Sequence, residues 1–200
     1  MLAMNQSLNE LKDQVLKCTN CSLAYTRRQV IFGEGNPRAS IMVVGEAPGY
    51  DEDIQGRPFV GKSGQLLDKI LAACGFSRTE HLYISNIVKC HPPENRVPTL
   101  NEAEICMPYL LKQIEIIDPK ILILLGATSL KYMAGNTYRI TRDRGKWISV
   151  NGRLAMQVFH PAALLRNPAL KRPTWDDYKE VVRKYRELLM SIISRITYSN

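Results

Sequence analysis

No apolar run in this sequence approaches the roughly 20 residues that are needed to span a bilayer. Its first residues, MLAMNQSLNELKD, carry acidic side chains and lack the apolar core of a secretion signal. Internal repeats, low-complexity tracts and linkers are also missing. These absences argue against membrane and secreted proteins, and they predict a single intracellular domain over residues 1–200.

The chain is long enough to bury a substantial core, since 200 residues with 45% apolar side chains suit one globular domain. Its 27 lysines and arginines exceed its 19 aspartates and glutamates, which gives a net charge of +8. A basic balance of this kind favours an anionic partner such as nucleic acid.

The five cysteines are an odd number in a chain without an export signal, which favours thiolate chemistry over a disulfide framework. Cys74 falls on the apolar face of a predicted helix and is interpreted as a core thiol. The other cysteines are candidates for a four-thiolate site: Cys18, Cys21, Cys90 and Cys106. Their spacing allows structural zinc and an iron–sulfur cluster almost equally, and the alternative is that they are buried or incidental thiols.

Apolar segments that alternate with amphipathic ones predict an α/β fold. Aliphatic runs predict strands at 40–45, 82–88, 121–125 and 154–159. Helical periodicity and capping residues predict helices at 6–17, 63–74 (capped by Ser63), 100–117, 128–134 and 174–193. Residues 51–61 are polar and rich in glycine and proline, so they are expected to form a loop. The alternation implies a mostly parallel four-stranded sheet inside a three-layer α/β/α structure.

Polar residues follow the ends of the predicted strands. Glu46 comes after the first strand, the loop with His91 after the second, and His160 after the fourth. Ligands of parallel sheets bind beyond the carboxyl ends of the strands, near a topological switch point. The convergence therefore predicts a functional site at this edge of the sheet.

One motif is misleading. Residues 56–63, GRPFVGKS, match the phosphate-loop pattern G-x-x-x-x-G-K-[ST]. A phosphate loop follows a buried strand directly, but here the polar residues DEDIQ precede the motif, and no later apolar strand ends in the aspartate of a Mg²⁺ site. Nucleotide hydrolysis is therefore disfavoured, and Lys62, Ser63 and the helix N-terminus are left as candidate contacts for a nucleic-acid phosphate.

Three single residues admit both a structural and a functional interpretation. His160 is either a hydrogen-bonded structural histidine or a donor to a developing anion. Asn86 lies in an apolar strand, where its amide must bond either its own backbone or a ligand. Phe59 is either a core residue or an aromatic platform for a base.

The longer motifs resemble those of the family 4 uracil-DNA glycosylases, which contain an iron–sulfur cluster. The motifs are GEAPG at 45–49, GRPFVGKSGQLL at 56–67, YISNIVKCHPPENR at 83–96, ExxxCxPYL at 102–110, RGKW at 144–147 and FHPAxLLRNP at 159–168. The resemblance runs from Cys18 to about Tyr185, nearly the whole chain, and the motifs together are highly specific.

This resemblance implies the uracil-DNA glycosylase fold and the hydrolytic removal of uracil from DNA as a step of base excision repair. It also implies a 4Fe-4S cluster on Cys18, Cys21, Cys90 and Cys106. The uracil-binding residues that it implies are Gly45, Glu46, Ala47, Phe59, Asn86 and His160. Phe59 is expected to stack on the extruded base, Asn86 to pair with its O4 and N3 edge, and His160 to donate to O2 as negative charge develops.

The predicted catalytic residues are Glu46, His160 and Glu52. In the family 1 relatives, an aspartate that activates water stands at the position of Ala47, and an alanine cannot act as a base. Glu46 is therefore the first candidate for positioning the water, and Glu52 the second. The family 1 tyrosine that excludes thymine corresponds to Gly49, so Glu52 is also a candidate for that exclusion.

The segment 161–168 is expected to enter the minor groove, with Leu164 as a wedge in the base stack and Arg166 on a phosphate. Lys62, Ser63 and Arg96 complete the predicted DNA contacts. The cluster is predicted to be structural and to hold the loop with Arg96 against the DNA backbone.

Uracil-containing DNA is the expected partner, and the protein is expected to work as a monomer associated with the nucleoid. The sequence does not settle whether a sliding clamp is a partner. The alternative from another class is a non-catalytic iron–sulfur nucleic-acid-binding module, which would bind DNA with and without uracil alike and release no free base.

Overall fold

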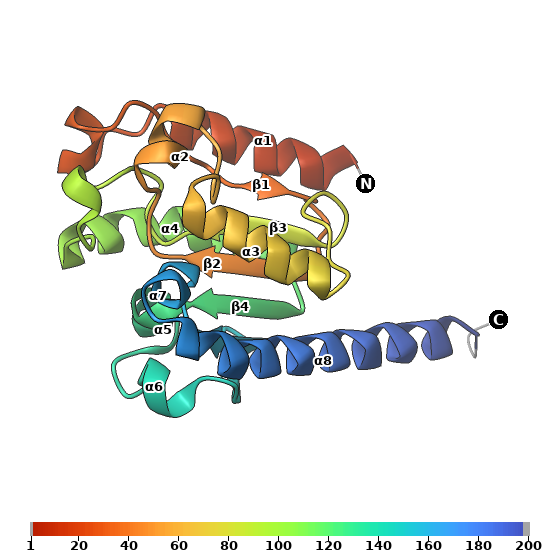
Figure 1. Cartoon of the computed structure of the whole chain (residues 1–200). Helices are drawn as coiled ribbons and strands as arrows, with labels where there is room; N and C mark the ends of the chain where they lie inside the picture. Colours follow the sequence, from red (N-terminus) through yellow and green to blue (C-terminus); the bar gives the residue numbers. More distant parts are fainter. Residues whose placement is uncertain (1, 198–200) are drawn as a thin grey trace.

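A mixed six-stranded sheet with the strand order β1-β3-β2-β4-β6-β5 forms the centre of the molecule (Figure 1). The computed structural model describes residues 2–197, with the side chains of residues 7–191 and 194. The predicted strands form the parallel centre as β3 (Leu82–Asn86), β2 (Ile41–Gly45), β4 (Ile121–Leu125) and β6 (Arg153–Val158). From β2 the chain first adds β3 on one side and then β4 on the other, which makes β2 a topological switch point.

Two antiparallel edge strands were missing from the prediction. β1 (Glu34–Gly35) pairs with β3, and β5 (Trp147–Val150) pairs with β6. β1 has only 2 residues, too few for a periodic signal, and β5 is partly exposed and follows a run of charged side chains. Such strands depend on pairing with a neighbour more than on an apolar pattern, so the sequence predicted four strands where the sheet has six.

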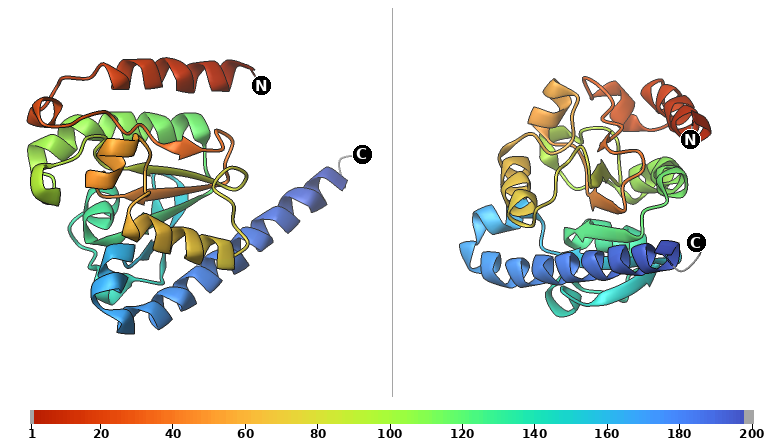
Figure 2. Two further views of the ribbon diagram at one scale, coloured as in Figure 1. Left: turned by 45° about the horizontal axis from the view of Figure 1, so that its top comes forward. Right: turned by 90° about the vertical axis from the view of Figure 1, so that its right-hand side faces the viewer.

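Helices cover both faces of the sheet (Figures 1 and 2). The helical elements are, in chain order, α1 (Leu2–Leu16), η1 (Ser22–Tyr25), α2 (Tyr50–Gln55), α3 (Lys62–Ala73), η2 (Pro93–Asn95), α4 (Leu100–Ile117), α5 (Gly126–Ala134), α6 (Ile140–Asp143), α7 (Pro161–Arg166), η3 (Pro168–Leu170) and α8 (Lys171–Thr197). On one face, α1, α4 and α5 share a core with Met42 and Val44 of β2. On the other face, α3 and α8 share a second core with Ile41 and Val43. Alternate residues of β2 are thus apolar on both sides because both faces are covered, which confirms the three-layer α/β/α arrangement.

The prediction of a loop at 51–61 was wrong for its first half, because residues 50–55 form the helix α2. Gly49 caps this short helix, and Asp51, Glu52 and Asp53 fill its first turn, where the helix dipole favours negative charge. The helix after it, α3, begins at Lys62 with Gly61 as its cap, so Ser63 is not the capping residue.

The C-terminal helix α8 is longer than predicted, since it begins at Lys171 and continues to Thr197. Arg144 anchors it near its start, with Nη2 and Nε at 2.6 and 2.9 Å from the two carboxylate oxygens of Asp177. The last turns of α8 project beyond the sheet (Figure 2). Among residues 2–197, no helix combines the length and the apolar character that crossing a membrane requires.

Candidate active site

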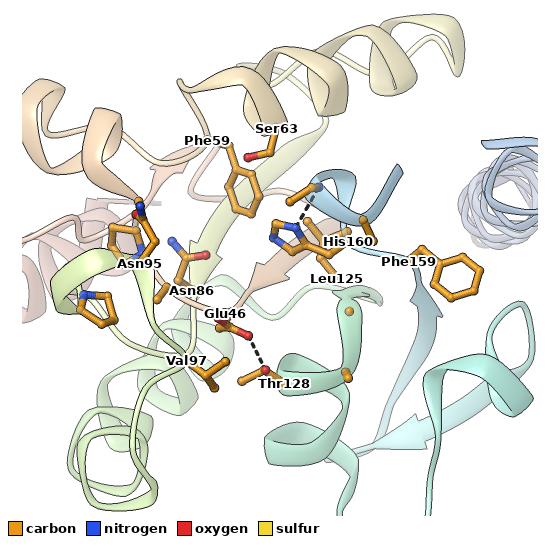
Figure 3. A pocket seen from close by; sticks show the side chains of 18 of the residues that line it. Glu46, Phe59, Ser63, Asn86, Asn95, Val97, Leu125, Thr128, Phe159 and His160 are labelled. Atoms are coloured by element: carbon orange, nitrogen blue, oxygen red, sulfur yellow. Dashed lines mark hydrogen bonds between the residues drawn. The ribbon is translucent and has the colours of Figure 1, made fainter. Parts of the chain in front are cut away.

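The carboxyl ends of the parallel strands open into a cavity of about 650 Å³. Glu46 follows β2, Asn86 ends β3, Leu125 ends β4 and His160 follows β6, and all four line the cavity (Figure 3). The cavity lies at the topological switch point. The polar residues that follow the strand ends in the sequence predicted a functional site at this edge of the sheet. Its volume is in the range of small-molecule and cofactor sites.

The side chain of Asn86 lines this cavity but is only 1% exposed, and its Oδ1 has no hydrogen-bond partner in the described part of the protein. Leaving a buried acceptor unpaired costs about 1–3 kcal/mol, so the oxygen is poised for a donor from outside the protein. Gly45 makes room for this arrangement. A Cβ at Gly45 would lie 2.3 Å from Oδ1 of Asn86 and 2.5 Å from the ring of Phe59.

Phe59 lies beside the cavity, and its backbone is strained. Its φ is 54°, in the left-handed region that non-glycine residues rarely adopt. Its carbonyl oxygen accepts a hydrogen bond of 2.6 Å from Nη2 of Arg78. Gly64 lets α3 approach so closely that a Cβ there would lie 2.0 Å from the Phe59 carbonyl group. The ring centroids of Phe59 and His160 are 5.8 Å apart. A strained backbone that its neighbours maintain in this way is typical of residues at functional sites.

Glu52 holds the connection between α2 and α3. Its Oε1 accepts hydrogen bonds of 2.8 Å from the N–H groups of Val60 and Gly61, and its Oε2 accepts one of 2.9 Å from Gly49. The residue is 7% exposed. Glu52 also lines the cavity, but three backbone donors already occupy its carboxylate, so its roles in positioning water and in excluding thymine stay predictions. Its hydrogen bonds fix the loop that carries Phe59.

His160 is a neutral imidazole of defined tautomer. Its Nδ1 accepts a hydrogen bond of 3.1 Å from the N–H of Ala162, at the start of α7, so Nε2 carries the ring proton. Burial of the ring and the charge of Arg166 lower the pKa of His160 to about 4. At neutral pH the residue is therefore a neutral donor through Nε2.

Glu46 is oriented by a residue that the sequence did not single out. Its carboxylate accepts a short hydrogen bond from the hydroxyl of Thr128, in α5 just beyond β4 (Figure 3). The rule that pointed to Glu46 and His160, a polar residue after a strand end, applies to Thr128 as well. Ala47, which follows Glu46, packs against the apolar core and lines the cavity.

The rim of the cavity carries several predicted DNA contacts. Ser63, Arg96 and Arg166 line it, and Lys62 is exposed beside Ser63. Arg96 is already paired, with its Nη2 at 2.7 Å from Oε1 of Glu102. Its side chain is 41% exposed, so it retains a face for a further partner.

Leu164 does not have the exposure that a wedge needs. It is 1% exposed, whereas its neighbour Leu165 is 46% exposed. Both belong to α7, and successive residues of a helix point in directions about 100° apart. The sequence could not show which leucine the helix turns outward, and in the structure it is Leu165.

Cys21, Cys90 and Cys106 pack in the core on the face of the sheet that α1 and α4 cover, and Cys18 lies near enough to act on the pKa of Cys106. These four residues are called the cysteine group. Burial raises the pKa of Cys90 to about 11 and also raises that of Cys106, and the charges of neighbouring thiolates, Cys21 among them, add to both shifts. Cys18 likewise acts on Cys106. In the described residues, no three His, Cys, Asp or Glu side chains form a group that could hold one metal ion.

Two donors connect this cysteine group to the rest of the chain. Arg27 donates from Nη1 to Sγ of Cys90 at 3.2 Å and from Nη2 to the carbonyl of Cys18 at 2.6 Å. The backbone N–H of Lys89 donates to Sγ of Cys106 at 3.3 Å. Hydrogen bonds to sulfur stabilise thiolates and tune the groups that thiolates bind. Cys74 is separate, since it packs against the core on the other face of the sheet, as its interpretation as a core thiol requires.

The segment that matches the phosphate-loop pattern follows α2, not a strand. Gly56 ends α2 in the left-handed conformation, with a φ of 72°. The structure therefore agrees with the rejection of nucleotide hydrolysis on sequence grounds.

The chain is similar to known proteins of one superfamily. The model of the Uracil DNA glycosylase superfamily matches residues 32–182. The type-4 uracil-DNA glycosylase of Thermotoga maritima is 42% identical to this chain, over 90% of this chain and 95% of the relative. The type-4 uracil-DNA glycosylase of Sulfurisphaera tokodaii is also 42% identical, over 88% of this chain and 83% of the relative. That of Archaeoglobus fulgidus is 37% identical, over 88% and 92%.

Proposed function

The chain belongs to the uracil DNA glycosylase superfamily, and from this premise we propose that it is a uracil-DNA glycosylase that works through the cavity at the switch point. A base inside a duplex is inaccessible, so the deoxyuridine is extruded into the cavity. Hydrolysis of the bond between N1 of uracil and C1′ of deoxyribose then frees the base and leaves an abasic site. The unpartnered Oδ1 of Asn86 is the observation that carries this proposal.

Asn86 reads the edge of the base. Its Oδ1 accepts the N3–H of uracil and its Nδ2 donates to O4, while the ring of Phe59 stacks on the base. Backbone groups of Gly45, Glu46 and Ala47 hold other atoms of the base. Cytosine has an acceptor at N3 and a donor at N4, so it would leave both groups of the Asn86 amide unpaired. Two unpaired buried groups cost several kcal/mol, which is enough to reject cytosine.

His160 stabilises the leaving group. As the glycosidic bond breaks, negative charge develops on the uracil ring, and Nε2–H of His160 donates to O2. Because the ring stays neutral, it contributes a hydrogen bond and transfers no proton. A positioned donor of this kind is commonly worth about 3–4 kcal/mol in the transition state. The bond from the Ala162 N–H to Nδ1 supports this role, since it leaves the proton on the nitrogen that donates.

Glu46 is the carboxylate that positions the attacking water and stabilises the positive charge that develops on the sugar. Thr128 fixes its orientation through their short hydrogen bond. Ala47 has no group that can replace it, and Glu52 is occupied by backbone donors. The catalytic set is thus Glu46 and His160, with Thr128 as a positioning residue.

The rim residues bind the DNA strand around the extruded nucleotide. Lys62, Ser63 and the N-terminus of α3 bind a phosphate on one side, and Arg166 binds one on the other. Leu165 fills the space that the extruded base leaves in the stack. Arg96 contacts the backbone from the loop that leads to α4.

A 4Fe-4S cluster on Cys18, Cys21, Cys90 and Cys106 fits the donors present: four converging thiols, two of which accept hydrogen bonds from N–H groups. When bound, the cluster supplies a cross-link between distant parts of the chain. The residues of the cavity carry out the hydrolysis.

We further propose that a single copy of the domain, residues 1–200, carries the whole activity, because Glu46, Asn86 and His160 line one cavity within the domain. An enzyme that removes uracil from chromosomal DNA works inside the cell, on the nucleoid.

The proposal is tested by single-turnover cleavage of oligonucleotides that differ only in one uracil or cytosine. The wild-type protein should leave abasic sites at uracil and none at cytosine. Asn86→Asp should cleave uracil at least about 100-fold more slowly and should begin to cleave cytosine, because its carboxyl group no longer matches uracil alone. A wild-type protein that binds both oligonucleotides equally and releases no base would instead be a non-catalytic binding module.

A further inference from the structure

The side chain of Lys89 lies inside the protein, 1% exposed, between the cysteine group and the uracil cavity. Its Nζ donates three short hydrogen bonds: 2.6 Å to Oγ of Ser85, 2.8 Å to the backbone carbonyl of Asn86 and 2.7 Å to Oε1 of Gln113. All three acceptors are neutral. A buried ammonium that has only neutral partners is costly unless negative charge lies nearby.

The acceptors around Lys89 are themselves fixed. Nε2 of Gln113 donates to the carbonyl of Phe32 at 2.8 Å and to the hydroxyl of Tyr83 at 3.4 Å, which turns Oε1 toward the ammonium. Ser85 and Gln113 are 1% and 0% exposed. The network therefore has no access to solvent, and the position of Nζ is determined by protein atoms alone.

The negative charge that acts on Lys89 comes from the cysteine group. The three hydrogen bonds of Nζ use all three donors of an ammonium group, so the side chain is bound in its charged form. Cys90 is the next residue in the chain, and Sγ of Cys106 accepts the backbone N–H of Lys89 at 3.3 Å. The same residue thus touches the cysteine group with its backbone and Asn86 with its side chain.

We propose that Lys89 is the buried counter-cation of the four-cysteine group and a positioning residue for Asn86. The inference rests on the proposed function, since it requires both the cluster and the recognition of uracil by Asn86. A 4Fe-4S cluster with four thiolate ligands carries net negative charge, which offsets the buried ammonium. The ammonium in turn closes the turn 86–89 and holds the end of β3, from which the Asn86 amide reaches the base.

Under this proposal the cluster affects base recognition through one side chain. Loss of the cluster would remove the negative charge that compensates the buried ammonium, and the turn 86–89 that the ammonium closes would be destabilised. The amide of Asn86 then loses its fixed position relative to the cavity. A cluster distant from the reacting bond can in this way support specificity without taking part in hydrolysis.

The test compares Lys89→Met with the wild-type holoprotein, in two measurements. The first is the midpoint reduction potential of the cluster, followed by its visible absorption during a redox titration. Removing a buried positive charge should shift the potential to more negative values, because the reduced cluster carries the greater negative charge.

The second measurement is uracil release, where kcat should fall about 10- to 100-fold while KM for the DNA stays nearly constant. Lys120→Met, which removes a surface lysine paired with Asp118, is the matched control and should change neither.

A second variant covers the outcome in which Lys89→Met does not fold. Gln113→Glu keeps Lys89 and its bond to Asn86 but adds a carboxylate beside the ammonium. It should also shift the potential negatively, with a smaller loss of kcat. An unchanged potential in the variants that fold would overturn the counter-cation role, and an unchanged kcat in Lys89→Met would overturn the positioning role. Wild-type protein without iron or without uracil release would instead overturn the proposed cofactor or function, and the inference with it.

Discussion

Single hydrogen bonds decide what the polar residues of the cavity can do. Thr128 turns the carboxylate of Glu46 toward the site, and the N–H of Ala162 fixes the tautomer of His160. Glu52, by contrast, accepts hydrogen bonds from three backbone N–H groups. Two carboxylates that look alike in the sequence therefore have different partners, a side-chain hydroxyl for Glu46 and the loop that carries Phe59 for Glu52.

The low pKa of His160 predicts how stability depends on pH. Its folded-state value of about 4 lies below the value of about 6.5 in an unfolded chain. Between these values the unfolded chain binds an additional proton, so the contribution of His160 to stability is lost as the pH falls from about 6.5 to about 4. The free energy of unfolding of His160→Asn should therefore fall less than that of the wild type between pH 7 and pH 5. Urea unfolding at the two pH values measures this difference, and equal losses in both proteins would contradict it.

At the scale of elements, the N-terminus of α4 joins three segments through one carboxylate. Glu102 forms a capping box with Thr99, accepts a hydrogen bond of 3.0 Å from Ser22 beside the first cysteine pair, and binds Arg96 through both carboxylate oxygens. Arg96 is the main cause of a pKa of Glu102 lowered to about 2. The start of α4 thus positions both the cysteine group and the rim of the cavity.

Replacing Glu102 by Gln should lower the free energy of unfolding by about 1 kcal/mol, because the cap and the charged pair with Arg96 are weakened. Since its folded-state pKa is depressed, the stabilisation by Glu102 is present above about pH 4.5 and is lost as the pH falls toward 2. The variant should therefore lose less stability than the wild type over that acid range. Glu104→Gln, on the exposed side of the same helix, is the control and should unfold as the wild type does in urea. Identical curves for all three proteins would refute the role of Glu102.

The sequence was sufficient for the elements that a periodic pattern determines. The four central strands, the main helices and the polar residues at the strand ends were predicted because burial imposes an apolar pattern on them. The short strands β1 and β5 and the helix α2 depend on partners and caps, which local composition does not reveal. The same limit applied to side chains: the sequence identified Asn86 and His160, but not Thr128 or the outward direction of Leu165.

At the scale of the whole molecule, the cysteine group links the first segment of the chain to the middle. Arg27 bridges Cys18 and Cys90, and Asp53 accepts the N–H groups of Arg28 and Gln29 at 3.0 to 3.3 Å. The segment between α1 and β1 is thereby held against the loop that follows β3, through Arg27, and against α2, through Asp53. Closing so long a loop restricts the unfolded chain, and this is the physical basis for the stabilisation we ascribe to the cluster.

Removing iron from the holoprotein with a chelator should lower Tm by about 10 °C, which corresponds to about 4 kcal/mol for a loop of this length. It should also weaken binding to DNA, because the loop with Arg96 loses its support. Calorimetry and a DNA titration measure the two effects, and limited proteolysis should show new cleavage sites before Arg28. If Tm and DNA affinity both stayed at the holoprotein values, the structural role of the cluster would be wrong.

The wide separation of the cysteines in the chain also imposes an order on biosynthesis. A ribosome releases Cys18 and Cys21 long before Cys106 of α4 has been translated. The proposed cluster therefore cannot be assembled on all four ligands until the chain has been translated through Cys106 and this residue has left the exit tunnel. In an iron-starved cell, the segment with Cys18 and Cys21 would stay unsupported in newly made molecules, and quality-control proteases would cleave them there first.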